Sequence, residues 1–183
     1  MHKFPRINEY KALTYRILLA YLFYFVARIL FFIYNGPLLK VDSIYNFLAL
    51  CYHGLVFDTT TILYVNSLFI LLSVLPLKIN TKKGFQKFLF YLYFVTNLFA
   101  YATNFIDFIY YRYTFSRSTR ASLDTLENEQ NKVLLLFNFM LNYWHVFLIF
   151  IVMAIVWIAL YKRYTVKQFI PKVNVKYFAV STA

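Results

Sequence analysis

Residues 15–34 read YRILLAYLFYFVARILFFIY, an apolar run that carries charge only at Arg16 and Arg28. An α-helix needs roughly 20 mainly apolar residues to cross the hydrocarbon core of a bilayer, which is about 30 Å thick. Three further apolar stretches of similar length lie at 60–77, 88–110 and 143–161. Open strands would leave unpaired backbone groups in lipid, so these stretches indicate helices. The predicted fold class is all-α: a polytopic membrane helix bundle with four full transmembrane helices, forming a single transmembrane domain over 1–183.

The overall composition excludes an ordinary soluble domain. Of the 183 residues, 62% are hydrophobic and 23% are aromatic, whereas only 14% are charged. A soluble chain of this size cannot hide so much apolar surface from water. The formal net charge is +12, but the basic residues lie at the ends of the apolar runs and not on one face of a soluble scaffold. No nucleic-acid partner is therefore expected.

Three shorter apolar segments add to the expected bundle. Residues 43–57 surround a central Cys-Tyr-His-Gly and are too short to cross comfortably, which predicts an interfacial or re-entrant helix. Residues 133–140 predict either an extension of the fourth span or a second interfacial helix. Residues 177–183 begin a new apolar run that is too short to span, which predicts the start of a fifth helix, with a small interfacial foot as the alternative. The chain is accordingly expected to be a truncated fragment of a longer membrane protein.

Basic residues are distributed unevenly between the connections. Lys and Arg dominate the segment before the first span, the connection between the second and third spans, and the tail, whereas the other two connections balance bases with acids. Lys and Arg are retained on the cytoplasmic side of membranes. The sequence therefore predicts a multi-pass protein of the cell inner or plasma membrane with a cytoplasmic amino terminus. The same basic residues are expected to contact the head groups of membrane phospholipids.

Arg28 is the clearest polar residue inside a predicted span. An ionisable group within the hydrocarbon costs about 2.5 to 3.5 kcal/mol on insertion scales, so it requires a partner or a purpose. One interpretation is an outward-facing polar cavity in which Arg28 holds a lipid phosphate. The other is a buried ion pair with Asp58 or Asp107, which lie at the outer ends of the second and third spans.

Amide and hydroxyl side chains recur every seven residues in two of the spans. Thr59, Asn66 and Ser73 follow this spacing in the second span, and Asn97 and Asn104 follow it in the third. Residues spaced in this way share one face of a helix. Hydrogen bonds between such faces contribute about 0.6 to 2 kcal/mol each in membranes, so a structural role between helices is expected.

No catalytic or metal-binding motif is recognisable in the sequence. It contains neither a glycine-rich phosphate loop nor a spacing of Ser, Cys, His and Asp that is typical of nucleophilic catalysis. His145 lies near Asn138 and Asn142, but one histidine and two amides make poor metal ligands, so a hydrogen-bonded interfacial histidine is expected. Cys51, the only cysteine, is expected to be a small buried hydrophobe. No catalytic residue, metal ligand or cofactor is predicted in this chain.

Three stretches in a fixed order resemble a known family. They are YFVARILFFIYN at 24–35, GLVFDTTTILYVNSLFILLSVLP at 54–76 and NFIDFIYYRYTFSR at 104–117. Together they resemble the amino-terminal membrane domain of lipoteichoic acid synthase-like proteins, which belong to the alkaline phosphatase/sulfatase superfamily. The resemblance implies about five transmembrane helices joined to an extracytoplasmic catalytic domain. In that domain a threonine and a divalent metal such as Mn²⁺ or Mg²⁺ transfer phosphoglycerol, or a related group, from a phospholipid to an acceptor.

The resemblance implies a role for this chain and not an activity. The chain alone is not expected to be an enzyme. It would anchor a separate or downstream extracytoplasmic catalytic domain and shape the surface where the lipid substrate enters. The positions that match the polar residues of the family's membrane motifs are Arg28, Asp58, Asn66, Asn104, Asp107, Arg112 and Arg117. The alternative functions are a small membrane transporter or channel subunit, or a structural membrane protein.

Overall fold

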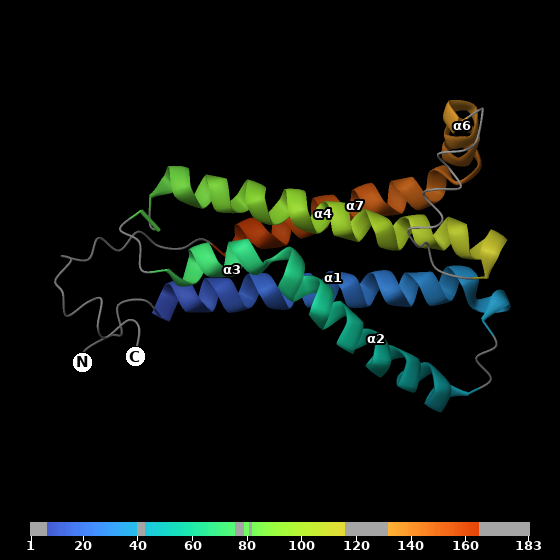
Figure 1. Cartoon of the computed structure of the whole chain (residues 1–183), viewed down its shortest axis with the longest axis horizontal. Coiled ribbons are helices and arrows are strands. Elements are labelled where there is room, and N and C mark those ends of the chain that lie inside the picture. The colour runs from blue at the N-terminus through green and yellow to red at the C-terminus, as the bar shows by residue number, and fades with distance from the viewer. Residues whose placement is uncertain (1–6, 40–42, 76–78, 81, 116–131, 165–183) are drawn as a thin grey trace.

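The structure, a computed structural model of the whole chain, describes residues 7–39, 43–75, 79–80, 82–115 and 132–164. These residues form helices and turns, and no strand occurs among them. The elements are α1 (Ile7–Asn35), the 3-10 helix η1 (Gly36–Leu38), α2 (Ile44–Val65), α3 (Ser67–Val74), α4 (Lys83–Thr114), α6 (Lys132–Asn142) and α7 (Trp144–Arg163). Helices α1, α4 and α7 lie side by side along the long axis of the molecule (Figure 1).

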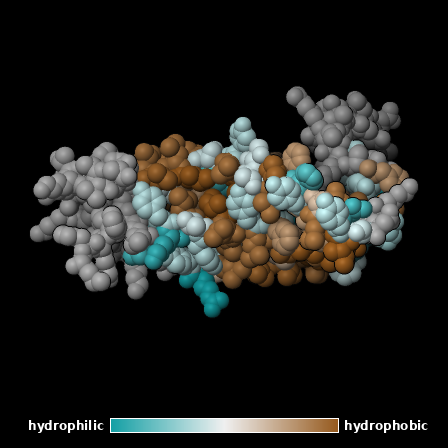
Figure 2. All heavy atoms as spheres, turned by 90° about the horizontal axis from the view of Figure 1, so that it is seen from below, coloured by the Kyte–Doolittle hydropathy of each residue, from teal (hydrophilic) through white to brown (hydrophobic). Residues whose placement is uncertain are grey.

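Four helical segments are long and apolar enough to cross a membrane. They cover Asn8–Leu38, Ile44–Val65, Lys83–Arg112 and Trp144–Arg163. The prediction of an all-helical chain with four helices able to span a membrane is therefore confirmed. Many large apolar side chains of these helices are exposed, and hydrophobic residues cover much of the face shown in Figure 2, with the hydrophilic residues lying toward its two ends. Such a surface is unfavourable in water and suits contact with lipid.

The second span begins and ends at different residues from those predicted. The sequence predicts an interfacial helix over 43–57 and a separate span over 60–77, but α2 runs without interruption from Ile44 to Val65. The three threonines at 59–61 do not end the helix. Each of their hydroxyls donates to the carbonyl oxygen four residues earlier, at 2.8, 3.3 and 3.1 Å. The helix is interrupted at Asn66 instead, and α3 follows from Ser67.

The segment before the fourth span is a separate helix and not an extension of that span. The two helices meet at Tyr143, whose N–H donates to the Phe139 carbonyl oxygen at 2.9 Å. The Tyr143 backbone then departs from helical geometry (φ −117°, ψ 26°), so α6 ends at Asn142 and α7 begins at Trp144. Figure 1 shows α6 turned away from the long axis that α7 follows. The predicted start of a fifth helix at 177–183 lies outside the described residues.

An aromatic core joins α1, α4 and α7. Phe23 of α1 stacks on Trp157 of α7 with ring centroids 4.6 Å apart, and Tyr93 and Tyr101 of α4 meet Trp157 edge-on. Trp157 Nε1 donates to the Tyr93 hydroxyl at 3.1 Å, and this hydroxyl donates to the Arg16 carbonyl oxygen at 2.8 Å. Burial of the two polar tips is favourable because each finds a partner. The core thus fixes the three helices through ring packing and a chain of hydrogen bonds.

Two asparagine side chains hydrogen-bond to each other and hold the junction of α2 and α3 against α4. Asn66 Nδ2 donates to Asn97 Oδ1 at 3.0 Å, and Asn97 Nδ2 donates to Asn66 Oδ1 at 2.7 Å. Each Nδ2 also donates to a carbonyl oxygen of its own helix, that of Ile62 or Tyr93. Both asparagines are fully buried. The interhelical hydrogen bonding that the seven-residue spacing predicts is therefore present for this pair.

We expect Asn97→Leu to lower the free energy of unfolding by about 1 to 2 kcal/mol, because the amide of Asn66 loses its partner inside the bundle. The matched control is Asn104→Leu, since the Asn104 amide is only seen to donate within its own helix, to the Ala100 carbonyl oxygen at 3.5 Å. Thermal unfolding in detergent, followed by circular dichroism, measures both. Equal midpoints for the two variants would show that the amide pair contributes nothing.

Candidate functional site

Arg28 and Asp58 form a buried ion pair between α1 and α2. Arg28 NH2 lies 2.6 Å from Asp58 Oδ2, and the two side chains are 8% and 15% exposed. The same nitrogen donates to the Gly54 carbonyl oxygen at 2.7 Å. The structure thus agrees with the interpretation of Arg28 as a member of a buried pair, and it selects Asp58 as the partner. A carboxylate and a carbonyl together meet the requirement that a buried cation be both neutralised and hydrogen-bonded.

Gly54 provides the space that the guanidinium group occupies. A Cβ atom at this position would lie 0.7 Å from Arg28 NH1 and 1.9 Å from its Cζ. Gly54 and Asp58 are four residues apart, so they share one face of α2. On that face, Gly54 leaves room for the guanidinium group, and the Asp58 carboxylate one turn later binds it. Gly54 is not among the site residues that the sequence predicts, although a glycine four residues before an aspartate in an apolar helix could have indicated it.

Two tyrosine hydroxyls are buried close to this level of the bundle. Tyr24, one turn before Arg28 on α1, and Tyr101 of α4 have ring centroids 6.0 Å apart. Neither hydroxyl has a hydrogen-bond partner among the described residues, and the same holds for Arg28 Nε. Buried polar groups of this kind are commonly satisfied by ordered water. The interior near the ion pair therefore has unused hydrogen-bonding capacity.

The other predicted site residues lie along the length of the bundle. Asn66 pairs with Asn97, as described above, and Asn104 and Asp107 follow on α4, where Asp107 is 8% exposed. Arg112, in the last turn of α4, places its Cζ 4.5 Å from the centroid of the Tyr34 ring, and its NH2 donates to the Tyr34 carbonyl oxygen at 3.4 Å. Arg117 lies outside the residues that the structure describes. Arg28 and Asp58 are thus brought together directly, whereas Arg112 joins a different layer.

This second polar layer connects the carboxyl ends of α1 and α4 with the start of α7. The Tyr34 hydroxyl and His145 Nε2 lie 3.0 Å apart, and the Tyr34 ring stacks on Phe108 at 5.9 Å between centroids. Asn35 is fully buried, and its Nδ2 donates to the Phe108 carbonyl oxygen at 3.4 Å. His145 is therefore hydrogen-bonded, as predicted.

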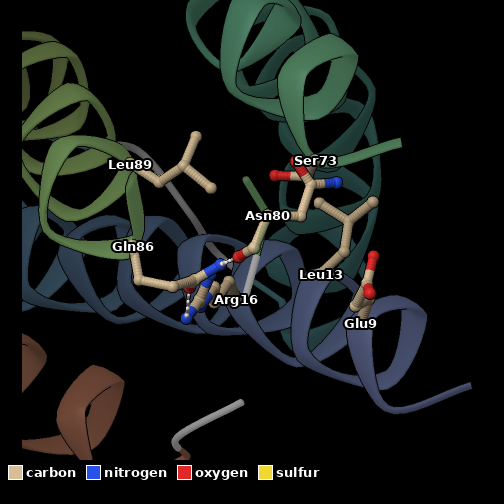
Figure 3. A pocket seen from close by; sticks show the side chains of 7 residues that line it. All are labelled: Glu9, Leu13, Arg16, Ser73, Asn80, Gln86 and Leu89. Atoms are coloured by element: carbon tan, nitrogen blue, oxygen red, sulfur yellow. Dashed lines mark hydrogen bonds between the residues drawn. The ribbon is translucent and has the colours of Figure 1, made fainter. Parts of the chain in front are cut away.

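A third polar layer surrounds Arg16 at the opposite end of the bundle. Arg16 is 6% exposed, its NH2 donates to Gln86 Oε1 at 3.2 Å, and its Cζ lies 4.5 Å from the centroid of the Tyr161 ring. Gln86 Nε2 in turn donates to the Asn80 carbonyl oxygen at 2.6 Å. Figure 3 shows Arg16, Gln86 and Asn80 at a pocket. Its lining residues are Glu9, Leu13, Arg16, Ser73, Asn80, Gln86 and Leu89.

From the sequence, Arg16 is one of the basic residues of the amino-terminal segment, which flanks the first span. Long basic side chains at such a boundary usually extend their charge into the head-group region. Nothing in the sequence distinguishes Arg16 from its basic neighbours, because its burial depends on Gln86 and Tyr161, which belong to other helices.

Cysteine and the usual metal ligands form no cluster in the described part of the chain. No group of three or more His, Cys, Asp or Glu side chains that could hold a metal ion occurs among those residues. Cys51 is a free thiol that is 8% exposed, which confirms its predicted burial.

Comparison with known proteins adds no family to these observations. No protein-family model, no curated protein and no solved structure matches the chain. The class of protein that the fold and the site define is therefore a helical bundle with four helices able to span a membrane and a buried ion pair between α1 and α2.

We expect Arg28→Leu to lower the free energy of unfolding by about 3 to 5 kcal/mol, because it leaves the Asp58 carboxylate buried without its cation. The double variant Arg28→Leu/Asp58→Leu should recover most of this loss, since apolar replacement of both partners of a buried pair is often nearly neutral. Unfolding titrations in mixed detergent micelles measure the three proteins. A double variant that is no more stable than Arg28→Leu would argue against the pair.

The effect of Gly54→Ala on stability is expected to depend on whether Arg28 and Asp58 are present. In the wild type, Gly54→Ala displaces the guanidinium group from Asp58 and from the Gly54 carbonyl, so stability should fall. In an Arg28→Ala/Asp58→Ala background, the same change should raise stability by up to about 1 kcal/mol, because alanine is the better helix former. The same titrations provide the measurement. Loss of stability in both backgrounds would show that Gly54 is required for another reason.

Proposed function

We propose that this chain is the membrane-anchoring, lipid-facing domain of a lipoteichoic acid synthase-like phosphoglycerol transferase. The buried contact of Arg28 with Gly54 and Asp58 is the observation that supports this proposal most. It joins the first two of the three stretches on which the resemblance rests, 24–35 and 54–76. Polar residues of these two stretches therefore act together, because they hold α1 and α2 against each other.

Contacts between the first and third stretches, 24–35 and 104–117, also support the proposal. Asn35 donates to the Phe108 carbonyl oxygen, and Arg112 lies over the ring of Tyr34. These contacts fix the ends of α1 and α4 against each other. A rigid arrangement at this end of the bundle suits a platform on which a catalytic domain meets the membrane surface.

In the proposed topology the amino terminus is cytoplasmic, and the ends of α1 and α4 lie on the outer side of the inner or plasma membrane. Arg112 is exposed there, so it can bind the phosphate of an outer-leaflet phospholipid through its planar guanidinium group. Arg28 has a different role in this proposal, because Asp58 already neutralises its charge. It holds α1 and α2 together, and the Mn²⁺- or Mg²⁺-dependent transfer belongs to a catalytic domain outside these 183 residues.

A fusion protein tests this function. When the chain replaces the membrane domain of a lipoteichoic acid synthase-like enzyme, we expect membranes that contain the fusion to incorporate labelled glycerol phosphate into polymer. The catalytic domain on an unrelated four-helix anchor should incorporate less, because that anchor lacks the lipid-binding surface. Arg112→Gln should lower incorporation, whereas Arg163→Gln, an exposed residue at the opposite end, should not. Equal activity on both anchors would contradict the proposal.

A further inference from the structure

α2 exposes polar side chains along the part of its length where α1 and α7 expose only apolar ones. Asn46, His53 and Thr60 of α2 are exposed. By contrast, every exposed residue of α1 within 17–33 and of α7 within 147–160 is apolar. His53 lies about 14 Å along the helix axis from the first residue of α2. Ionisable residues in membrane helices rarely face lipid, so an exposed His53 calls for a partner outside the bundle.

The polar side chains on this side of α2 keep unused hydrogen-bonding capacity. The His53 ring meets the ring of its neighbour Tyr52 with centroids 5.8 Å apart. Neither the His53 ring nor the Asn46 amide forms a hydrogen bond with another described residue. The Thr60 hydroxyl donates to the Val56 carbonyl oxygen of its own helix at 3.3 Å, which leaves its oxygen free to accept. All three groups are therefore able to bond to a helix that packs beside α2.

These polar residues alternate with large apolar residues along one stripe of α2, which we call the outer stripe. Its members are Asn46, Leu50, His53, Phe57, Thr60 and Tyr64. Successive members are alternately four and three residues apart. Leu50, Phe57 and Tyr64 are 44%, 74% and 78% exposed. This alternation of steps is the pattern of the seam along which two helices pack in a left-handed coiled coil.

The arrangement of α2 leaves the outer stripe open to a second helix. The buried residues of α2 are Cys51, Gly54 and Ile62, and they belong to another face of the helix. Figure 1 shows the amino-terminal half of α2 diverging from α1. A second helix can therefore pack along the outer stripe without displacing α1.

We propose that the outer stripe of α2 is the surface at which two copies of this chain associate in the membrane. Copies inserted with the same orientation are related by a two-fold axis along the membrane normal, so their α2 helices run parallel and each residue meets its counterpart. The stripe suits this pairing because it carries no carboxylate, lysine or arginine. An amide, a neutral imidazole and a hydroxyl each donate and accept, so each polar residue bonds to its own copy. The inference is independent of the proposed function, because it involves neither Arg112 nor a catalytic domain.

Cysteine cross-linking in membranes tests this arrangement. In a Cys51→Ala background, His53→Cys and Thr60→Cys each place one thiol on the outer stripe, and Ile151→Cys places one on the exposed face of α7 as the control. Mild oxidation should link two copies of the stripe variants, because their Cα atoms approach within about 7 Å, and should leave the α7 variant monomeric. Equal yields at the three positions would overturn the proposal. Cross-links from the stripe to a different protein would also overturn it, because they would assign the stripe to another partner.

The dissociation constant of the dimer tests the role of the polar residues. Native mass spectrometry of the full chain over a detergent dilution series should show a dimer. We expect His53→Leu to raise its dissociation constant about tenfold and Thr60→Leu about threefold, because the apolar side chain packs against lipid as well as against protein. Thr103→Leu is the matched control, since Thr103 is an exposed threonine of α4 whose hydroxyl also donates within its own helix, to the Ala100 carbonyl oxygen at 2.7 Å. A monomer at every dilution, or equal effects of Thr60→Leu and Thr103→Leu, would show that the proposal is wrong.

Discussion

A guanidinium group inside an apolar bundle has to be neutralised and hydrogen-bonded, and the arrangement of α1 and α2 depends on how Arg28 meets this requirement. Asp58 supplies the charge, the Gly54 carbonyl supplies an acceptor, and the missing side chain of Gly54 supplies the space. α2 therefore approaches α1 closely at this level. Figure 1 shows the first half of α2 diverging from α1, and the ion pair joins α1 to the second half of α2.

α1 is the helix on which the other helices converge, and its polar residues explain why. It contacts α2, α3, α4 and α7. Arg16 reaches α4 and α7, Arg28 reaches α2, and Asn35 reaches α4. These three levels are spaced along the length of α1, so sliding or rotation of this helix would break contacts to several neighbours at once. The apolar residues between the levels supply packing, and the polar residues set the register.

Sequence alone was sufficient for the helical class and for four helices able to span a membrane, because apolar length and flanking charge are local properties. It was not sufficient to predict where the second span begins and ends. Asp58 and the three following threonines resemble a polar end of a helix, and only the partner on α1 and the hydroxyl bonds to the preceding turn make them compatible with its interior. The sequence also could not identify the partner of Arg28, since spacing along the chain allows Asp58 and Asp107 equally. Gly54 and Arg16 owe their importance to residues on other helices, which no local pattern reveals.

The distance along the sequence between Arg28 and Asp58 has a consequence for biosynthesis. α1 emerges from the ribosome before α2, so for a time its guanidinium group has no carboxylate to meet. A charge at that depth disfavours transfer of α1 into lipid on its own, by about 2.5 to 3.5 kcal/mol on insertion scales. We therefore expect release of α1 from the translocon to be favoured once α2 has arrived beside it, so that the two helices enter the bilayer together as a hairpin.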